Sequence, residues 1–249
     1  MLQSKNFLPL IYLASACVFF PVGLEAQANE LNLQTNQTKT ITVAQRTSRL
    51  RFRLPNRGVP GARIGGATRA GSKTVTAIVP EKKLGLTASD APTLFVYIPE
   101  HESTDAQLII SNDKGEKVYT SNFTPPQESG ILRIKLPESV ALENNQMYKW
   151  EVKLKSQKSD PMSSLKLKTS GWVEKVAVEN VDNNQEEWDK LNTLAEAGIW
   201  HDTLDTLASM KLANPSDETI QNEWNQLLED VGLEGFTDAN IISKVVQVN

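Results

Sequence analysis

The period of the hydrophobic pattern changes once along this 249-residue chain, and that change constrains the fold more than any other feature. Before residue 180, apolar residues gather in short runs that are bounded by turn residues, as strands do. Seven runs of this kind can be distinguished: 74–79, 93–98, 106–111, 115–120, 131–136, 147–154 and 165–173. Residues 73–180 are therefore predicted to form an immunoglobulin-like antiparallel β-sandwich.

Two local patterns support strands in this region. The segment Asn112-Asp113-Lys114-Gly115 is typical of a tight turn, so the runs on either side of it are expected to form a hairpin. In 147–154 every second residue is apolar, which indicates one buried face. We interpret Trp150, which lies on that face, as a core residue rather than a ligand contact.

From residue 183 onward the apolar positions recur at helical spacing. Three sets of apolar residues each form one face of a predicted helix. They are Trp188, Leu191, Leu194 and Ala195; Leu204, Leu207 and Ala208; and Ile220, Trp224, Leu227, Leu228 and Val231. Gly198 is expected to end the first helix. Asn214 is expected to cap the third, with Pro215 at its first position and Asp217 in its first turn. Residues 183–249 are thus a predicted helical module, whose tail either packs back or frays.

The helical hairpin at the start of this module resembles a tetratricopeptide unit. The repeat's glycine, aromatic, small, large, small and proline positions are occupied by Gly198, Trp200, Thr203, Leu207, Met210 and Pro215. Threonine and methionine stand where alanine is usual, and only one unit with the start of another is visible. One unit cannot build the long concave groove of such arrays. The hairpin is therefore either a binding module or a helical pair packed on the sandwich.

Residues 1–28 read as a cleavable secretory signal peptide. Lys5 precedes an apolar run from Phe7 to Phe20, and Ala26-Gln27-Ala28 supplies the small residues that signal peptidase requires. The alternatives are an uncleaved anchor and a lipoprotein modified at Cys17, for which the required leucine stands one place too early. We expect an exported protein, periplasmic or extracellular, with residues 29–47 as a flexible tether and no membrane span after cleavage.

Cysteine usage excludes several kinds of chemistry. Cys17 is the only cysteine, so cleavage leaves a chain with none. A disulfide framework, cysteine-based catalysis and thiolate metal sites are excluded with it, and no cofactor is expected. Hydrophobic residues make up 39% and charged residues 22% of the chain, which is typical of a protein that folds by core burial alone.

The charge is distributed unevenly about a net value of −4. Residues 41–90 hold ten Lys or Arg against two Asp or Glu, whereas residues 183–249 hold three against thirteen. Such asymmetry indicates either two different partners or two ends that face each other. An acidic protein without a basic helix is a poor nucleic-acid binder, so no nucleic-acid partner is expected.

The segment 48–72 alternates glycine and arginine with little apolar content, and it is predicted to be a loop or an extended arm. One interpretation is an anion or glycan contact, in which glycines expose backbone N–H groups and arginines add charge-assisted bonds. The candidate binding residues are Arg57, Arg63, Arg69, Gly65 and Gly66. The other interpretation is a structural arm that crosses the sandwich, with its arginines paired to the acidic helices.

No catalytic motif stands out. The two histidines, His101 and His201, have no metal-binding spacing around them, and we interpret both as solvated surface residues. No GxSxG nucleophile motif is present, so there is no catalytic candidate. The carboxylates of the helical module are interpreted as solvated helix faces.

Several motifs together resemble the cyanobacterial domain of unknown function 928 family. They are Arg57-Gly58, Gly61–Arg69, Leu84–Thr87, Pro92–Pro99, Tyr148–Trp150, Gly171–Val173, Ala195–Asp202 and Trp224–Leu228. The resemblance implies an exported cyanobacterial protein and implies no reaction. The favoured hypothesis is a non-enzymatic binding or protein-interaction module whose partner is an envelope protein or an anionic polysaccharide. The alternative is a hydrolase of envelope glycans or peptides, which a sheltered pocket with His101 or paired carboxylates would favour.

Overall fold

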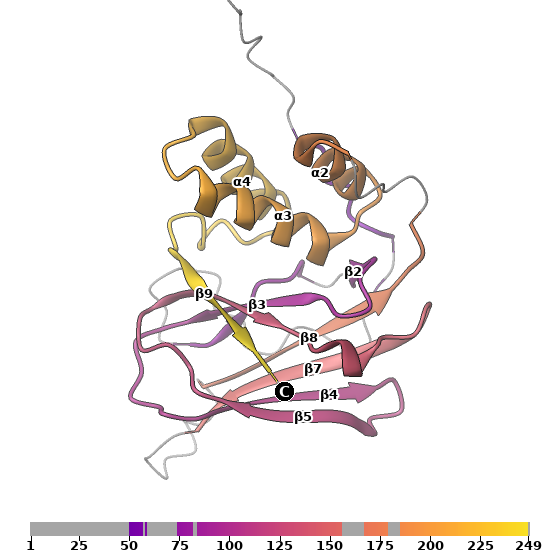
Figure 1. Cartoon of the computed structure of the whole chain (residues 1–249), viewed down its shortest axis with the longest axis vertical. Helices are drawn as coiled ribbons and strands as arrows, with labels where there is room; N and C mark the ends of the chain where they lie inside the picture. Colours follow the sequence, from indigo (N-terminus) through magenta and orange to yellow (C-terminus); the bar gives the residue numbers. More distant parts are fainter. Residues whose placement is uncertain are drawn as a thin grey trace, which may run out of the picture. The chain divides into compact units, whose positions relative to one another are not determined.

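The computed structural model describes residues 50–56, 58, 74–81, 84–155, 167–178 and 185–248 (Figure 1). The predicted signal peptide, the tether and most of the Gly/Arg-rich arm lie outside the described residues. The described elements are β1 (Thr76–Ala77), β2 (Gly85–Thr87), β3 (Thr93–Ile98), β4 (Ala106–Asn112), β5 (Lys117–Phe123), β6 (Gly130–Lys135), the 3-10 helix η1 (Glu138–Val140), β7 (Met147–Leu154), β8 (Lys168–Lys175), α2 (Glu187–Glu196), α3 (Trp200–Ala213), α4 (Glu218–Asp230) and β9 (Ile241–Gln247).

The strands form two sheets, with the orders β1-β3-β6-β9 and β2-β8-β7-β4-β5. Neighbouring strands are antiparallel except for two pairs, β2 with β8 and β6 with β9, which are parallel. Both sheets are therefore mixed, and the prediction of a purely antiparallel arrangement is wrong. The cause is that β2 and β9 each pair with a strand far away in the sequence, which local turn signals do not reveal. With the three helices, the fold is α+β.

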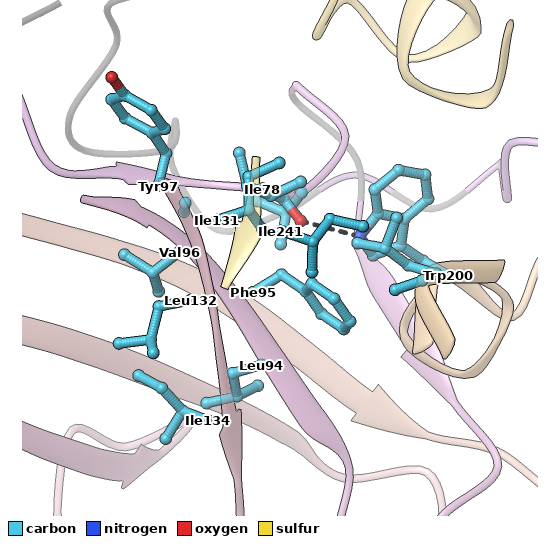
Figure 2. Packing of buried hydrophobic residues seen from close by; sticks show 14 of the residues in the cluster. Ile78, Leu94, Phe95, Val96, Tyr97, Ile131, Leu132, Ile134, Trp200 and Ile241 are labelled. Atoms are coloured by element: carbon cyan, nitrogen blue, oxygen red, sulfur yellow. Dashed lines mark hydrogen bonds between the residues drawn. The ribbon is translucent and has the colours of Figure 1, made fainter. Parts of the chain in front are cut away.

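Strand β3 is almost wholly apolar because both of its faces are covered. All six of its residues are buried. Figure 2 shows Leu94 and Val96 on one side of the strand, and Phe95 on the other side, toward Trp200 of α3. Alternate side chains of a strand point to opposite faces, so a strand with helices on one face and a second sheet on the other buries both sets of side chains. Thr93, at the start of the strand, satisfies its hydroxyl with a hydrogen bond to Asp205.

Strand β7 behaves as its alternation predicts. Its buried and partly buried residues alternate strictly, and Trp150 is fully buried. Trp150 is paired with Gly171 of β8, where an added Cβ would lie 2.5 Å from the indole ring. Glycine at this position therefore makes room for the tryptophan. The predicted hairpin is also confirmed, since Gly115, at φ +82°, closes a turn by donating its N–H to the carbonyl of Asn112.

The helices follow the predicted faces, with one correction at a boundary. Gly198 ends α2 with φ +73°, and a Cβ there would lie 2.5 Å from the carbonyl oxygen of Arg53. Asn214 does not cap α4; it ends α3, and its side chain donates to the carbonyl of Met210. The N-cap of α4 is Asp217, whose carboxylate accepts two backbone N–H groups of the first turn. An aspartate offers the stronger acceptor, which explains why the helix begins three residues later.

The tail packs back as strand β9, which lies parallel to β6 in the four-stranded sheet. The three helices thus stand in the chain between two strands of the fold. A buried hydrogen bond joins the layers, from the indole N–H of Trp200 to the carbonyl of Ile78, at 3.0 Å (Figure 2). By their contacts, residues Thr47–Asn249 form one compact unit.

Candidate functional site

The five residues predicted to bind an anion, Arg57, Arg63, Arg69, Gly65 and Gly66, lie outside the described residues. The described start of the arm lies against the helices. The N–H of Leu50 donates to the Glu223 carboxylate at 2.8 Å, and the N–H of Arg53 donates to a carbonyl at the end of α2 at 3.0 Å. The Phe52 ring meets Trp200 edge-on at 5.3 Å. This part of the arm is therefore held by backbone bonds and ring packing, while the Arg53 residue is exposed.

The two histidines are not the solvated residues that the sequence suggested. His101 is partly buried, and both of its ring nitrogens are engaged. Because a carbonyl can only accept, Nε2–H donates to the carbonyl of Pro126 at 3.0 Å, and Nδ1 accepts the N–H of Ser103 at 3.1 Å. His101 therefore links two loops, and no ring nitrogen is left for chemistry.

His201 is fully buried in the first turn of α3. Its Nδ1 donates to the carbonyl of Thr93 at 3.3 Å, so Nε2 carries no proton. An added Cβ at Gly85 would lie 2.7 Å from Nε2, which shows that this nitrogen faces the backbone of β2. Burial lowers the pKa of His201 to about 4, although the bond to Thr93 acts in the opposite direction. A neutral imidazole in this place is part of the packing between α3 and the sheets.

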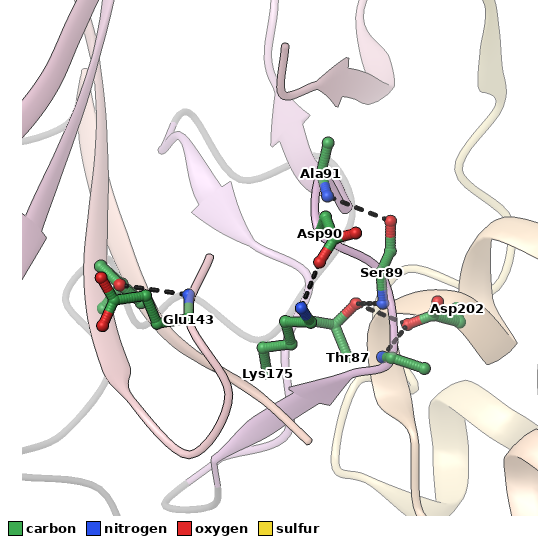
Figure 3. A network of polar contacts seen from close by, with 9 residues as sticks. Thr87, Ser89, Asp90, Ala91, Glu143, Lys175 and Asp202 are labelled. Atoms are coloured by element: carbon green, nitrogen blue, oxygen red, sulfur yellow. Dashed lines mark hydrogen bonds and ion pairs between the residues drawn. The ribbon is translucent and has the colours of Figure 1, made fainter. Parts of the chain in front are cut away.

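Two carboxylates beside His201 tie α3 to the end of β2 and to the start of β3. Asp202 accepts from the Thr87 hydroxyl at 2.7 Å and from the N–H of Ala88 at 3.1 Å (Figure 3). Asp205 accepts from the Thr93 hydroxyl at 3.0 Å. Burial raises the pKa of Asp202, and the charge of Asp205 adds to this, while the bonds from Thr87 and Ala88 oppose it.

The histidine and the two carboxylates line a cavity of only about 110 Å³. Ligand pockets usually occupy about 300–1,000 Å³, so this cavity is well below the size of an ordinary ligand site. The Asp202 contacts within it already serve the fold, as Figure 3 shows for the loop that carries Thr87 and Ser89.

A much larger hollow is an open cleft of about 780 Å³, which we name the Lys211 cleft. It is lined by the end of α3, by α4 and by the segment that leads into β9. The lining residues are Glu128, Lys211, Leu212, Pro215, Gln221, Asn225, Thr237, Asp238, Ala239, Asn240, Ile241, Ile242 and Ser243. Its size is that of an ordinary ligand site.

A short chain of hydrogen bonds crosses the wall of the Lys211 cleft. The Lys211 ammonium donates to the side-chain oxygen of Gln221. The Gln221 amide then donates to the side-chain oxygen of Asn225 at 2.8 Å. Burial lowers the pKa of Lys211. Sequence analysis did not single out these residues: Gln221 and Asn225 are helical neighbours, but only the turn between α3 and α4 brings Lys211 to them.

The described residues contain no group of three or more His, Cys, Asp or Glu that could hold a metal ion. Within the same residues, no helix combines the length and the apolar character needed to cross a membrane.

The sequence model of a family described as "Domain of Unknown Function (DUF928)" matches residues 56–241. The chain belongs to the DUF928 family. The resemblance drawn from the motifs is thereby confirmed. In this DUF928 chain the matched range begins in the arm, contains both histidines and the lining of the Lys211 cleft except Ile242 and Ser243, and ends at the first residue of β9.

Comparison with other proteins adds no activity. No curated protein matches the DUF928 chain. A solved structure of a β-glucuronidase from Parabacteroides merdae, with glycerol in its active site, is similar to 68% of this chain at 10% identity and a TM-score of 0.26. The similar region spans 28% of that enzyme chain. A similarity this low supports no functional argument, so the function has to be argued from the site itself.

Proposed function

We propose that this DUF928 protein is an exported, non-enzymatic binding protein of the cell envelope, and that its partner lies in the Lys211 cleft. The observation that carries the proposal is the contrast between the two sites. Around His201 the described hydrogen bonds join one part of this chain to another. The cavity beside them has a volume of only about 110 Å³. The Lys211 cleft, at about 780 Å³, is open and has polar groups along its wall. A binding function needs the second kind of site and not the first.

The finer architecture is part of the proposal. We propose an immunoglobulin-like sandwich that carries a tetratricopeptide-like hairpin, with the cleft where α3 and α4 meet the strand that follows them. The predicted signal peptide at residues 1–28 supports export to the periplasm or beyond, the family resemblance supports a cyanobacterial source, and the acidic balance of the chain argues against nucleic acid as a partner.

Fractionation and affinity capture test this function. The tagged protein is expressed in its own cells, and cell fractionation determines its compartment. The proteins and glycans that it retains are identified. Each is then titrated against the purified DUF928 protein by calorimetry. We expect saturable binding to an envelope component without turnover. The matched variant Asn225→Asp, which places a negative charge in the cleft wall, should weaken it. A cytoplasmic location, or binding that is unchanged in Asn225→Asp, would contradict the proposal.

A second candidate, a hydrolase of envelope glycans or peptides, is favoured by one observation: Asp202 and Asp205 line the same small cavity and burial raises the pKa of Asp202. Paired carboxylates in different environments are what acid–base hydrolysis uses. Envelope polysaccharide and peptidoglycan incubated with the protein would then yield new reducing ends or amines, and Asp205→Asn would abolish the yield. We expect no such release.

A further inference from the structure

Lys211 is a cation that forms no ion pair with the described residues. It is partly buried, and in the part of the chain that the structure describes it has a neutral amide, Gln221, as its partner and no ion pair. Burial lowers the pKa of its ammonium, so the charged form is partly desolvated in this position. A desolvated ammonium is stabilised poorly by one amide and much better by a carboxylate, so this site is incomplete without an anion.

The hydrogen-bond chain fixes which atoms the cleft offers. An ammonium can only donate, so Gln221 must turn its oxygen toward Lys211 and its NH2 group toward Asn225. Asn225 accepts this bond with its oxygen, which leaves its own NH2 group for a ligand. Lys211 keeps two further N–H donors. The wall therefore presents donors at both ends, and it is complementary to a group that accepts hydrogen bonds.

The rim limits how much negative charge a ligand can carry. Two exposed carboxylates, Glu128 and Asp238, lie at the same cleft. The surrounding residues 183–249 hold thirteen acidic residues against three basic ones. The additional negative charges of a polyanion would be repelled by these two carboxylates. A ligand with a single carboxylate at Lys211 has no further negative charge to place beside them.

The remaining lining distinguishes a peptide from a glycan. Leu212, Pro215 and Ile241 supply apolar surface, and no aromatic ring is present among the described lining residues. Aliphatic side chains beside amide donors suit the side chains and carbonyls of an extended peptide.

We infer that the Lys211 cleft binds a polypeptide segment through one carboxylate, which Lys211 and Asn225 hold, and that the residues flanking this carboxylate are uncharged or basic. The inference rests on the proposed function and names its partner class. The segment contributes one Asp or Glu side chain or a terminal carboxylate, and its aliphatic side chains contact Leu212 and Ile241.

Selection from a random peptide library displayed against the immobilised protein tests the inference. We expect enriched peptides to share one acidic position flanked by uncharged or basic residues. Replacing that residue by Gln or Asn, or amidating a terminal carboxylate, should weaken binding about tenfold or more, since a hydrogen bond to a charged group contributes about 1.5–3 kcal/mol.

Three variants separate the site from a general charge effect. Lys211→Met keeps the aliphatic stem of the side chain. This variant should bind the selected peptides about tenfold more weakly and should no longer prefer an acidic residue in them. Gln221→Glu supplies an internal carboxylate to Lys211, so it should weaken peptide binding by the same factor. The free energy of unfolding should stay equal or rise. Lys244→Met, in a separate hollow along β9, is the control and should bind as the unchanged protein does.

Several results would overturn the inference. They are a library that enriches nothing, an acidic preference that survives Lys211→Met, and polygalacturonate that binds the protein in a Lys211-dependent way while no peptide does. The proposed function fails separately if the protein is cytoplasmic or captures no envelope partner. A captured envelope partner that binds equally well to Lys211→Met and to the unchanged protein would leave an envelope-binding protein, but its partner would lie outside the Lys211 cleft, and the inference would be lost together with the cleft part of the proposal.

Discussion

Acid should destabilise this protein through His201 in particular. The ordinary pKa of the imidazole is 6.5, and burial lowers it to about 4 in the folded chain. Between these values the unfolded chain binds a proton that the folded chain excludes, so the free energy of unfolding falls as the pH drops. At pH 4.5 the unfolded histidine is almost fully protonated and the folded one is largely neutral. The loss relative to pH 7 is therefore about 2 kcal/mol from this one residue.

The substitution His201→Asn removes this pH-dependent contribution to the free energy of unfolding and changes few contacts. The asparagine amide can occupy the place of Nδ1 and donate to the Thr93 carbonyl, and it does not titrate between pH 4 and 7. The lost ring atoms should cost about 1–2 kcal/mol at every pH. Ile220→Val, at another buried position, should cost about 1 kcal/mol and leaves the histidine in place. It is the control for destabilisation as such.

Urea unfolding followed by tryptophan fluorescence at pH 7.0 and 4.5 gives the required free energies. The unchanged protein and Ile220→Val should each lose about 2 kcal/mol more between the two pH values than His201→Asn. The raised pKa of Asp202 acts in the opposite direction, because the folded chain then binds the extra proton as the pH falls. Its effect is common to all three proteins. Equal losses in His201→Asn and the unchanged protein would refute a buried neutral imidazole.

Four further substitutions probe the fold, each by urea unfolding. Asp217→Ala should cost about 1 kcal/mol as the loss of a helix cap, and Asn214→Ala less than half of that; the reverse order would favour Asn214 as the cap. Gly171→Ala should cost about 1–3 kcal/mol, because its Cβ would overlap the Trp150 ring, and a neutral result would mean that β8 can shift. Trp200→Phe should cost about 1–3 kcal/mol, since a buried carbonyl after β1 loses its donor; an unchanged midpoint would mean that water replaces the indole.

The elements that the sequence predicts well are those whose pattern is local. The alternation in β7 needs only the strand itself, and the turn at Gly115 needs only its own four residues. Gly198 is predicted because ending a helix with positive φ is a local demand that glycine meets best. Strand β9 escapes prediction because its partner, β6, lies more than 100 residues earlier. Nothing near β9 in the sequence indicates a parallel neighbour.

The burial of His201 escapes prediction for a related reason. His201 stands next to Asp202 at the start of a helix, where polar residues are usually solvated. Its burial follows from β2 and β3, which approach α3 from a distant part of the chain, and from Gly85, whose missing side chain leaves room for the ring. Tertiary contacts of this kind carry no signal at the position itself.

The uneven charge of the chain gains a more specific meaning from the structure. Residues 183–249 contain three lysines, Lys190, Lys211 and Lys244, and each of them lines a hollow of the described surface. In a module so rich in acid, lysines would be expected to pair with neighbouring carboxylates, yet the ion pairs found among the described residues belong to Lys153, Lys168 and Lys175. Cations kept apart from abundant anions retain their attraction for a ligand. The acidic surroundings then exclude polyanions and admit a single carboxylate, so the module's overall charge acts as a filter for the cleft that Lys211 lines.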